Sequence, residues 1–248
     1  LRTADVGCQA VVAAYGMRPQ RISKISDFWT DPFSDPKHPA NVLYKGVENV
    51  LIVCKEKKIP KLVRLTGLSV GLSPWNPFII IFGMLASMTV RWHRECEMLI
   101  RDSGVDYTVV RPVNLNDDPV AAETGDKLLL ASDSWEENEE PPVSTGISRQ
   151  DVANLICLAL VDSRCSKATL RVARADPPSA SNNYSEDTRA ATDWEALLPT
   201  VKSDTREMAE FDHGTPVVIV ATAILSALLG FLLTLARYFL GLVGLLPP

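Results

Sequence analysis

Residues 215–236 read TPVVIVATAILSALLGFLLTLA, and this stretch decides the organisation of the chain. It contains no charged side chain, and it is long enough for one helix to cross a bilayer, which takes roughly 20 apolar residues. The preceding residues have the patterning of a water-soluble domain that combines strands and helices. The sequence therefore predicts an α/β domain that one C-terminal transmembrane helix ties to a membrane.

Small side chains recur at every fourth position of this apolar stretch. They are Thr222, Ser226, Gly230 and Thr234. Residues four apart lie on the same side of a helix. Small residues let two helices approach closely in lipid, where burial of apolar surface offers no driving force. We predict a helix-packing interface along this face, with a simple lipid-facing surface as the alternative.

Arg237 follows the apolar stretch, and Tyr238 and a further apolar piece follow Arg237. An arginine next to a tyrosine suits the interfacial zone of a membrane, where its long stem can extend toward the headgroups. We therefore assign the transmembrane or interfacial segment to residues 215–246. Arg237 is expected to contact the membrane or a partner subunit.

Composition disfavours several classes of function. The formal net charge is −5, and no long basic cluster is present, which argues against nucleic-acid binding. The five cysteines are dispersed without a CxxC pair, which indicates reduced thiols rather than a disulfide framework. The three histidines lack metal-ligand spacing, so no metal site is predicted.

Strand and helix patterns alternate along the first 174 residues. A strand at 7–15, a helix at 41–57 and a strand at 61–68 imply parallel strands joined by a right-handed crossover. Ser148 and Asp151 resemble a capping box at the start of a helix. The remaining expected elements are helices at 91–103 and 149–160 and strands at 107–110, 127–130 and 168–172.

Three further segments complete the domain organisation. Residues 77–90 are apolar but too short to span a bilayer comfortably; they form either the start of a core helix or a surface that touches the membrane or a partner. Residues 133–140 are acidic and are expected to be a solvated loop. Residues 175–214 are predicted to be a polar linker with a short helix near Trp194. The contact residues expected in the apolar segment are Phe78, Ile79, Ile80 and Phe82.

Four motifs appear in order along the domain: YKGVEN at 44–49, WHxxxE at 92–97, SGVDYTVVRP at 103–112 and ISRQDVA at 147–153. Together they resemble the patterns of atypical short-chain dehydrogenases of the NAD(P)-binding, NmrA-like group. This group includes plastid and cyanobacterial proteins that assist photosystem assembly. The resemblance covers about residues 5–173 and implies a Rossmann-like parallel sheet with flanking helices.

The chain departs from this family at its chemical positions. It contains no GxxGxxG turn, whose backbone amides would hold the cofactor pyrophosphate, so the domain is expected to be a partial Rossmann-like fold that begins near the fourth strand. No Tyr-xxx-Lys pair is present; His93 occupies the family's lysine position, and Thr66-Gly67 stands at the usual serine. No catalytic, cofactor-binding or metal-binding residue is therefore predicted. NAD(P) is expected only if a Gly-rich loop exists upstream of Leu1.

A Rossmann-like scaffold without its chemistry does not by itself assign a function. The remaining features are contact features, so the sequence favours a structural accessory subunit whose partners are integral membrane subunits and lipid. The resemblance favours a thylakoid photosystem complex, with a mitochondrial respiratory complex of the inner membrane second. The alternative is an NAD(P)-dependent oxidoreductase or a nucleotide-sensing assembly factor whose cofactor-binding part precedes this sequence.

Overall fold

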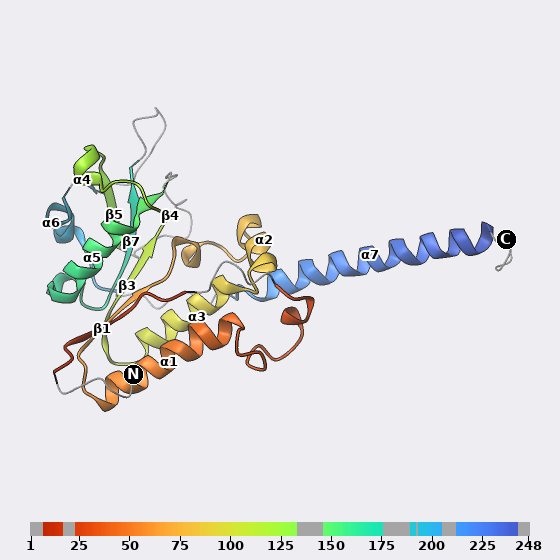
Figure 1. Cartoon of the computed structure of the whole chain (residues 1–248), viewed down its shortest axis with the longest axis horizontal. Helices are drawn as coiled ribbons and strands as arrows, with labels where there is room; N and C mark the ends of the chain where they lie inside the picture. The colour runs from red at the N-terminus through yellow and green to blue at the C-terminus, as the bar shows by residue number, and fades with distance from the viewer. Residues whose placement is uncertain are drawn as a thin grey trace.

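The computed structural model describes residues 7–16, 23–132, 146–175, 189–191, 193–204 and 212–242. These residues form an α/β domain from which one long helix projects (Figure 1). The order of strands and helices matches the order expected from the sequence. The fold class is thus confirmed as mixed α/β with flanking helices and one C-terminal apolar helix.

The domain is built on a mainly parallel sheet with the strand order β1-β2-β3-β7-β5-β8. The first four of these strands are parallel; β5 pairs antiparallel with β7, and β8 pairs antiparallel with β5, so that β8 again runs in the direction of the first four strands. Adjacent pairs such as Val63 with Thr108, and Val110 with Leu170, fix the register. The strand bounds are β1 (Ala10–Ala13), β2 (Lys61–Leu65), β3 (Asp106–Pro112), β5 (Leu128–Ser132), β7 (Ala168–Arg174) and β8 (Arg189–Ala191).

Helices cover both faces of the sheet. On one face α1 (Lys45–Glu56) and α3 (Thr89–Arg101) pack against apolar side chains such as Leu62 and Val109. On the other face α5 (Arg149–Val161) and α6 (Trp194–Leu197) pack against the alternate residues of the strands. Shorter elements complete the domain: η1 (Ile25–Phe28), η2 (Ala40–Tyr44), η3 (Leu68–Gly71), β4 (Leu115–Asn116), α4 (Ala121–Thr124), β6 (Ile147–Ser148), η4 (Ser163–Cys165) and η5 (Leu198–Thr200).

The folded unit extends beyond residue 174, where the sequence predicted the start of a linker. Strand β8 joins the sheet, and the predicted short helix, α6, buries Trp194 in the core. Asp204 then accepts hydrogen bonds from the backbone amide of Thr169 and the hydroxyl of Tyr107, at 3.0 and 2.9 Å. The predicted linker is therefore corrected: residues 189–191 and 193–204 belong to the folded domain, because they add a strand, a buried tryptophan and a hydrogen-bonding carboxylate to the edge of the sheet. The acidic loop at 133–140 lies outside the described residues.

The apolar segment at 77–90 divides into helix α2 (Pro77–Leu85) and the start of α3. Asn76 caps α2 by accepting a hydrogen bond from the amide of Phe78, at 2.9 Å. Met88, with a positive φ of 56°, then turns the chain into α3. Helix α2 lies beside the first turns of the C-terminal helix (Figure 1).

The C-terminal helix α7 (Thr215–Leu242) begins inside the domain and continues away from it (Figure 1). The Asp212 carboxylate accepts hydrogen bonds from the amides of Gly214 and Thr215, at 2.8 and 3.2 Å, and so provides acceptors for backbone amides at the start of the helix. Val217 and Ala221 are buried, whereas residues 222–239 are all exposed. Within the part of the chain that the structure describes, Thr215–Phe239 is the helix long and apolar enough to cross a membrane.

Candidate functional site

The parallel strands β1, β2, β3 and β7 all end at the same edge of the sheet, which is where open α/β sheets bind their ligands. Helix α3 begins near this edge, and its first turns carry the residues at the family's catalytic positions. The side chains of α3 and of the strand ends therefore define the candidate site.

A buried ion pair occupies the centre of this site. Arg111 on β3 donates through its Nε and Nη2 atoms to Glu97 on α3, with N–O distances of 3.2 and 2.5 Å. Thr66, just after β2, donates its hydroxyl to the same carboxylate at 2.5 Å. Arg111 and Glu97 are both fully buried. Because the acceptor atoms of Glu97 are engaged by two neighbours, this carboxylate is a packing group that joins helix to sheet.

A second buried cation secures the end of strand β1. Arg64 on β2 donates through Nη1 to the carbonyl oxygens of Ala13 and Tyr15, at 2.8 and 3.0 Å. Its guanidinium also lies over the Tyr15 ring, 4.4 Å from the centroid, as in a cation–π contact. A Cβ atom at Gly46 would lie 2.8 Å from the Tyr15 hydroxyl. The glycine of the YKGVEN motif therefore makes room for this tyrosine.

His93 is a neutral imidazole at this site. Burial, with the charge of Arg64 as the second cause, lowers the pKa of His93 from 6.5 to about 3. Classical dehydrogenases need a cation at this position to lower the pKa of a tyrosine four residues earlier. Here Thr89 stands four residues earlier, and its hydroxyl donates to the backbone carbonyl of Ala86. The pair His93 and Thr89 therefore cannot reproduce that acid–base chemistry.

The neighbouring thiol is inert as well. Cys96 is fully buried, and its Sγ lies 3.0 Å from the His93 carbonyl oxygen. Burial raises the pKa of the Cys96 thiol to about 12, so the nucleophilic thiolate is negligible at neutral pH.

The ISRQDVA motif serves the packing of α5 rather than chemistry. Ser148 accepts a hydrogen bond from the amide of Asp151 at 2.9 Å and caps α5, as predicted. The Asp151 carboxylate then accepts from the amide of Ala121 and from Arg174 Nη2, each at 3.1 Å. This buried carboxylate joins α5, α4 and β7. Sequence reasoning recognised the motif and the cap but missed Arg174, whose signal was a charge inside an apolar strand.

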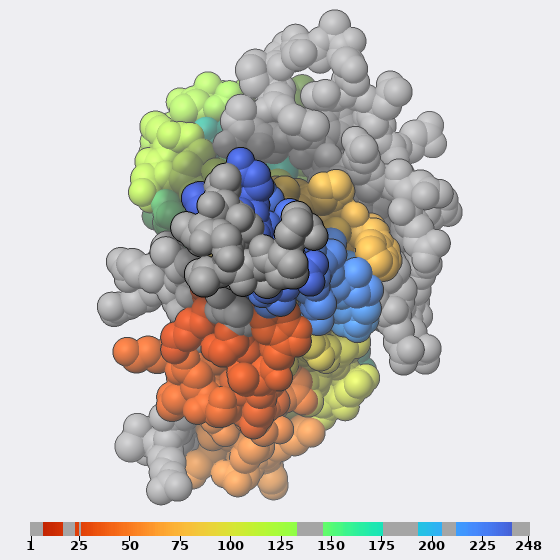
Figure 2. Space-filling model, turned by 90° about the vertical axis from the view of Figure 1, so that its right-hand side faces the viewer, coloured from red at the N-terminus to blue at the C-terminus, as the bar shows by residue number. Residues whose placement is uncertain are grey.

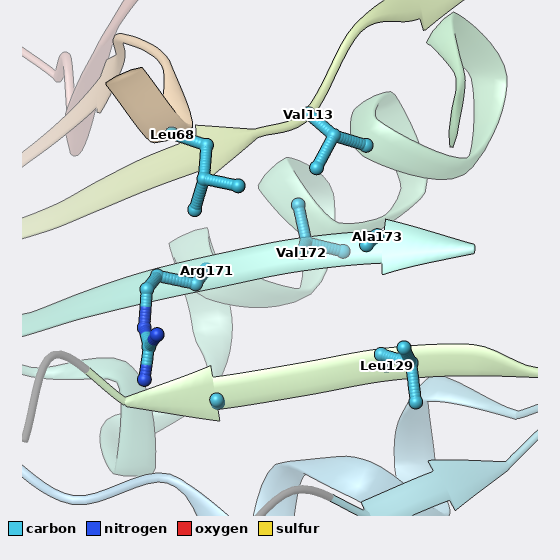
Figure 3. Close-up of a pocket in the computed structure, with 7 residues that line it drawn as sticks. Leu68, Val113, Leu129, Arg171, Val172 and Ala173 are labelled. Atoms are coloured by element: carbon cyan, nitrogen blue, oxygen red, sulfur yellow. The ribbon is translucent and has the colours of Figure 1, made fainter. Parts of the chain in front are cut away.

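A small cavity lies between η3 and the ends of β3, β5 and β7 (Figure 3). Leu68 and Val113 point toward strand β7, while the guanidinium of Arg171 turns toward β5 (Figure 3). The volume of this cavity is about 20 Å³, enough for about one water molecule. A nicotinamide ring needs far more room, so this cavity is not a cofactor pocket in this conformation.

The predicted contact residues fall into two groups. Thr222, Ser226, Gly230, Thr234 and Arg237 are exposed along α7, and no described atom outside the local backbone of the helix lies within 4 Å of the Cβ position of Gly230. In α2, Phe78 and Phe82 are exposed and Ile80 is partly exposed. Ile79, by contrast, is only 1% exposed, so the prediction that it contacts a partner or the membrane is wrong. It lies on the side of α2 that packs inward with Gly83, so it is not available to a partner.

The parallel sheet with helices on both faces defines a Rossmann-like protein. A family model described as NAD(P)H-binding matches residues 1–163, and the chain belongs to this family. Resemblance to this family, predicted from the four motifs, is thus confirmed.

A curated relative from Arabidopsis thaliana, "Uncharacterized protein At2g34460, chloroplastic", is 30% identical over 181 residues. The match covers 70% of this chain, and the chain spans 55% of that relative's length. Among solved structures, a candidate NAD-dependent epimerase/dehydratase of Bacillus halodurans has a TM-score of 0.51 at 17% identity, over 68% of this chain and 66% of that one. A short-chain dehydrogenase/reductase of Veillonella parvula has a TM-score of 0.45 at 14% identity, with coverages of 71% and 69%. At 17% identity the Bacillus halodurans structure bears on the fold alone.

Proposed function

We propose that this protein is a non-catalytic accessory subunit of a large membrane-protein complex, anchored by α7. The complex is a photosystem assembly of the plastid thylakoid. Its partners are integral membrane subunits and the surrounding lipid.

The observation that carries this proposal is the way in which α7 joins the domain. Val217 is 1% exposed and packs in one apolar cluster with Met88 and Trp92. His213, just before the helix, lies with its Nε2 atom 3.0 Å from the carbonyl oxygen of Leu72. The first turns of α7 are therefore part of the domain, and the domain keeps a fixed position relative to the helix. A fixed position is what a subunit requires if it is to make defined contacts with its neighbours.

The state of the strand-end site supports the non-catalytic part of the proposal. Thr66 donates a hydrogen bond to the Glu97 carboxylate, and Arg111 forms an ion pair with the same carboxylate. His93 is neutral, and the Cys96 thiol is buried. These side chains hold α3 against the sheet, which is a structural role.

The plastid location is supported by the chloroplastic relative. All five cysteines are free thiols, in keeping with a reducing compartment such as a stroma or matrix. The mitochondrial inner membrane remains the second location.

Membership of the NAD(P)H-binding family favours a second candidate function, an NAD(P)-dependent oxidoreductase or a nucleotide-sensing assembly factor. The two candidates differ in stoichiometry and in nucleotide binding. Gentle detergent solubilisation of native membranes, followed by native separation and mass spectrometry, tests both. Stoichiometric migration with a photosynthetic complex is expected. Migration as a free protein that binds NADPH saturably would reject the accessory-subunit proposal in favour of the second candidate.

A matched pair of variants tests the role of the small-residue face of α7. Gly230→Leu adds bulk on that face and is expected to weaken co-migration while membrane insertion persists, because it separates packed helices without reducing hydrophobicity. Leu228→Phe adds bulk on the opposite face of the helix and is expected to leave co-migration unchanged. Equal co-migration of both variants with the complex would contradict a packing role for this face.

A further inference from the structure

Helix α2 lacks the polar outer side that a surface helix normally has. Its nine residues, PFIIIFGML, include no polar side chain. Ile79 and Gly83 are buried on the inner side. Phe78, Ile81 and Leu85 on the outer side are 58%, 59% and 61% exposed. Apolar side chains exposed together in this way mark a surface that contacts something other than water.

The outer side of α2 lies next to the place where α7 leaves the domain. The two helices are in close contact, since a Cβ atom at Gly83 would lie 2.6 Å from Cγ2 of Val217. Burial of α7 ends at Ala221, which is 7% exposed, and residues 222–239 of the helix are exposed. The exposed side chains of α2 are therefore adjacent to the free part of α7.

A second segment on the same side of the domain also exposes aromatic side chains. Figure 2 looks at the face from which α7 projects, and shows the orange-red N-terminal segment and the golden helix α2 around the blue helix. Seven of the ten large apolar side chains exposed outside α7 in the described chain belong to these two segments and the residue leading into α2. We call them the α2 surface: Trp29, Phe33, Trp75, Phe78, Ile81, Phe82 and Leu85.

The length of α7 places a bilayer boundary at this surface. From Thr222 to Arg237, which is expected at the far membrane interface, the free part of the helix spans about 24 Å at a rise of 1.5 Å per residue. The hydrocarbon core of a bilayer is about 30 Å thick. A helix of this length that crosses the bilayer therefore leaves no gap between the bilayer and the face that carries the α2 surface.

We propose that the α2 surface inserts into the headgroup–acyl boundary of the membrane that α7 crosses, so that the domain has a second, interfacial membrane contact. The proposal rests on the anchoring role of α7 in the proposed function. Lipid is the occupant because the surface is continuous with the membrane helix and is rich in tryptophan and phenylalanine, which suit the interface. Interfacial helices bury their apolar side by about 5–10 Å at this boundary.

Site-specific fluorescence quenching in vesicles tests this contact with the full chain. Cys8 and Cys157, the two cysteines that are not buried, are first changed to serine. An environment-sensitive dye is then attached at Ile81→Cys on α2, and the protein is reconstituted into phosphatidylcholine vesicles with or without brominated acyl chains. Ile52→Cys is the matched control, because Ile52 is another exposed helical isoleucine (48%) on α1, a helix that runs away from α7 (Figure 1).

A dye at Leu228→Cys reports separately on the insertion of α7. We expect brominated lipid to lower the emission from positions 81 and 228 by on the order of two-fold, and to leave position 52 unchanged. Quenching at 228 without quenching at 81 would overturn the interfacial contact and leave the anchor intact. If the protein then self-associated in a concentration-dependent way, the α2 surface would be assigned to a contact with a second copy of the chain. Absence of quenching at both 81 and 228 would overturn the anchor as well.

Discussion

The close packing of α7 against α2 predicts that Gly83→Ala weakens the contact between these two helices. A Cβ atom at this position would lie 2.6 Å from Cγ2 and 3.5 Å from Cγ1 of Val217. Val217 is β-branched and 1% exposed, so its side chain has little freedom to move away. The substitution must therefore push α2 and α7 apart.

The magnitude follows from two opposing terms. Overpacking of this kind costs about 1–3 kcal/mol, whereas replacing a helical glycine with alanine stabilises the helix by about 0.5–1 kcal/mol. With the central values of the two terms, about 2 and about 0.75 kcal/mol, the net loss is about 1.3 kcal/mol, which corresponds to about 8-fold faster amide exchange at the base of α7 where exchange follows the opening equilibrium.

Hydrogen exchange measured by mass spectrometry on the full chain in mild detergent is the assay. Gly230→Ala is the control, because it brings the same gain in helix propensity at a position where no described atom outside the local helix backbone lies within 4 Å. Adding Val217→Ala to Gly83→Ala should recover part of the loss, since it removes the atoms that clash. Unchanged amide exchange around Val218 in Gly83→Ala would refute the close packing of α2 on α7 and, with it, the fixed position of the domain relative to α7.

Two further predictions concern the strand-end site. Glu97→Gln leaves the charge of Arg111 buried without its carboxylate and should lower the free energy of unfolding in urea by about 3–5 kcal/mol. Glu95→Gln on the same helix, which loses only a long, exposed contact to Arg91, should cost less than about 0.5 kcal/mol. Similar urea midpoints for these two variants would contradict the buried pair. Because the folded-state pKa of His93 is lowered to about 3, its contribution to stability is fully present above pH 6.5 and is lost as the pH falls from 6.5 toward 3. His93→Gln should therefore lose less stability than the wild type between pH 7.5 and 5; parallel losses would show that the imidazole is not held neutral.

The helices and strands of the central sheet could be predicted because their signals are local. The apolar alternation and spacing at residues 41–57 and 61–68 predicted helix α1 and strand β2, and the structure confirms both. The antiparallel pairing of β5 with β7 and β8 was not predicted, because pairing between residues 128–130 and 189–191 depends on which sheet edge is free. The same limitation explains why residues 189–204 were assigned to a linker.

The site could be predicted only in part. Glu97 was recognised within the WHxxxE motif, but its partner Arg111 lies on the next strand and reaches it only when α3 packs on the sheet. Arg64 and Tyr15 are further apart in sequence, and their contact depends on the parallel pairing of β1 and β2. A charged residue inside an apolar strand was the available signal for both arginines, since a buried charge requires a partner.

The sequence by itself determined the apolar helix that begins at Thr215 and the order of the strands and helices, because hydropathy and periodicity are properties of contiguous residues. It left open whether residues 77–90 form a core helix or a contact surface. The tertiary structure decided that α2 has one side of each kind: Ile79 packs inward, while Phe78 and Ile81 face outward. Only packing brings Gly83 against Val217, since the approach of two segments so distant in the chain depends on the shapes of both helices and on the domain that holds them.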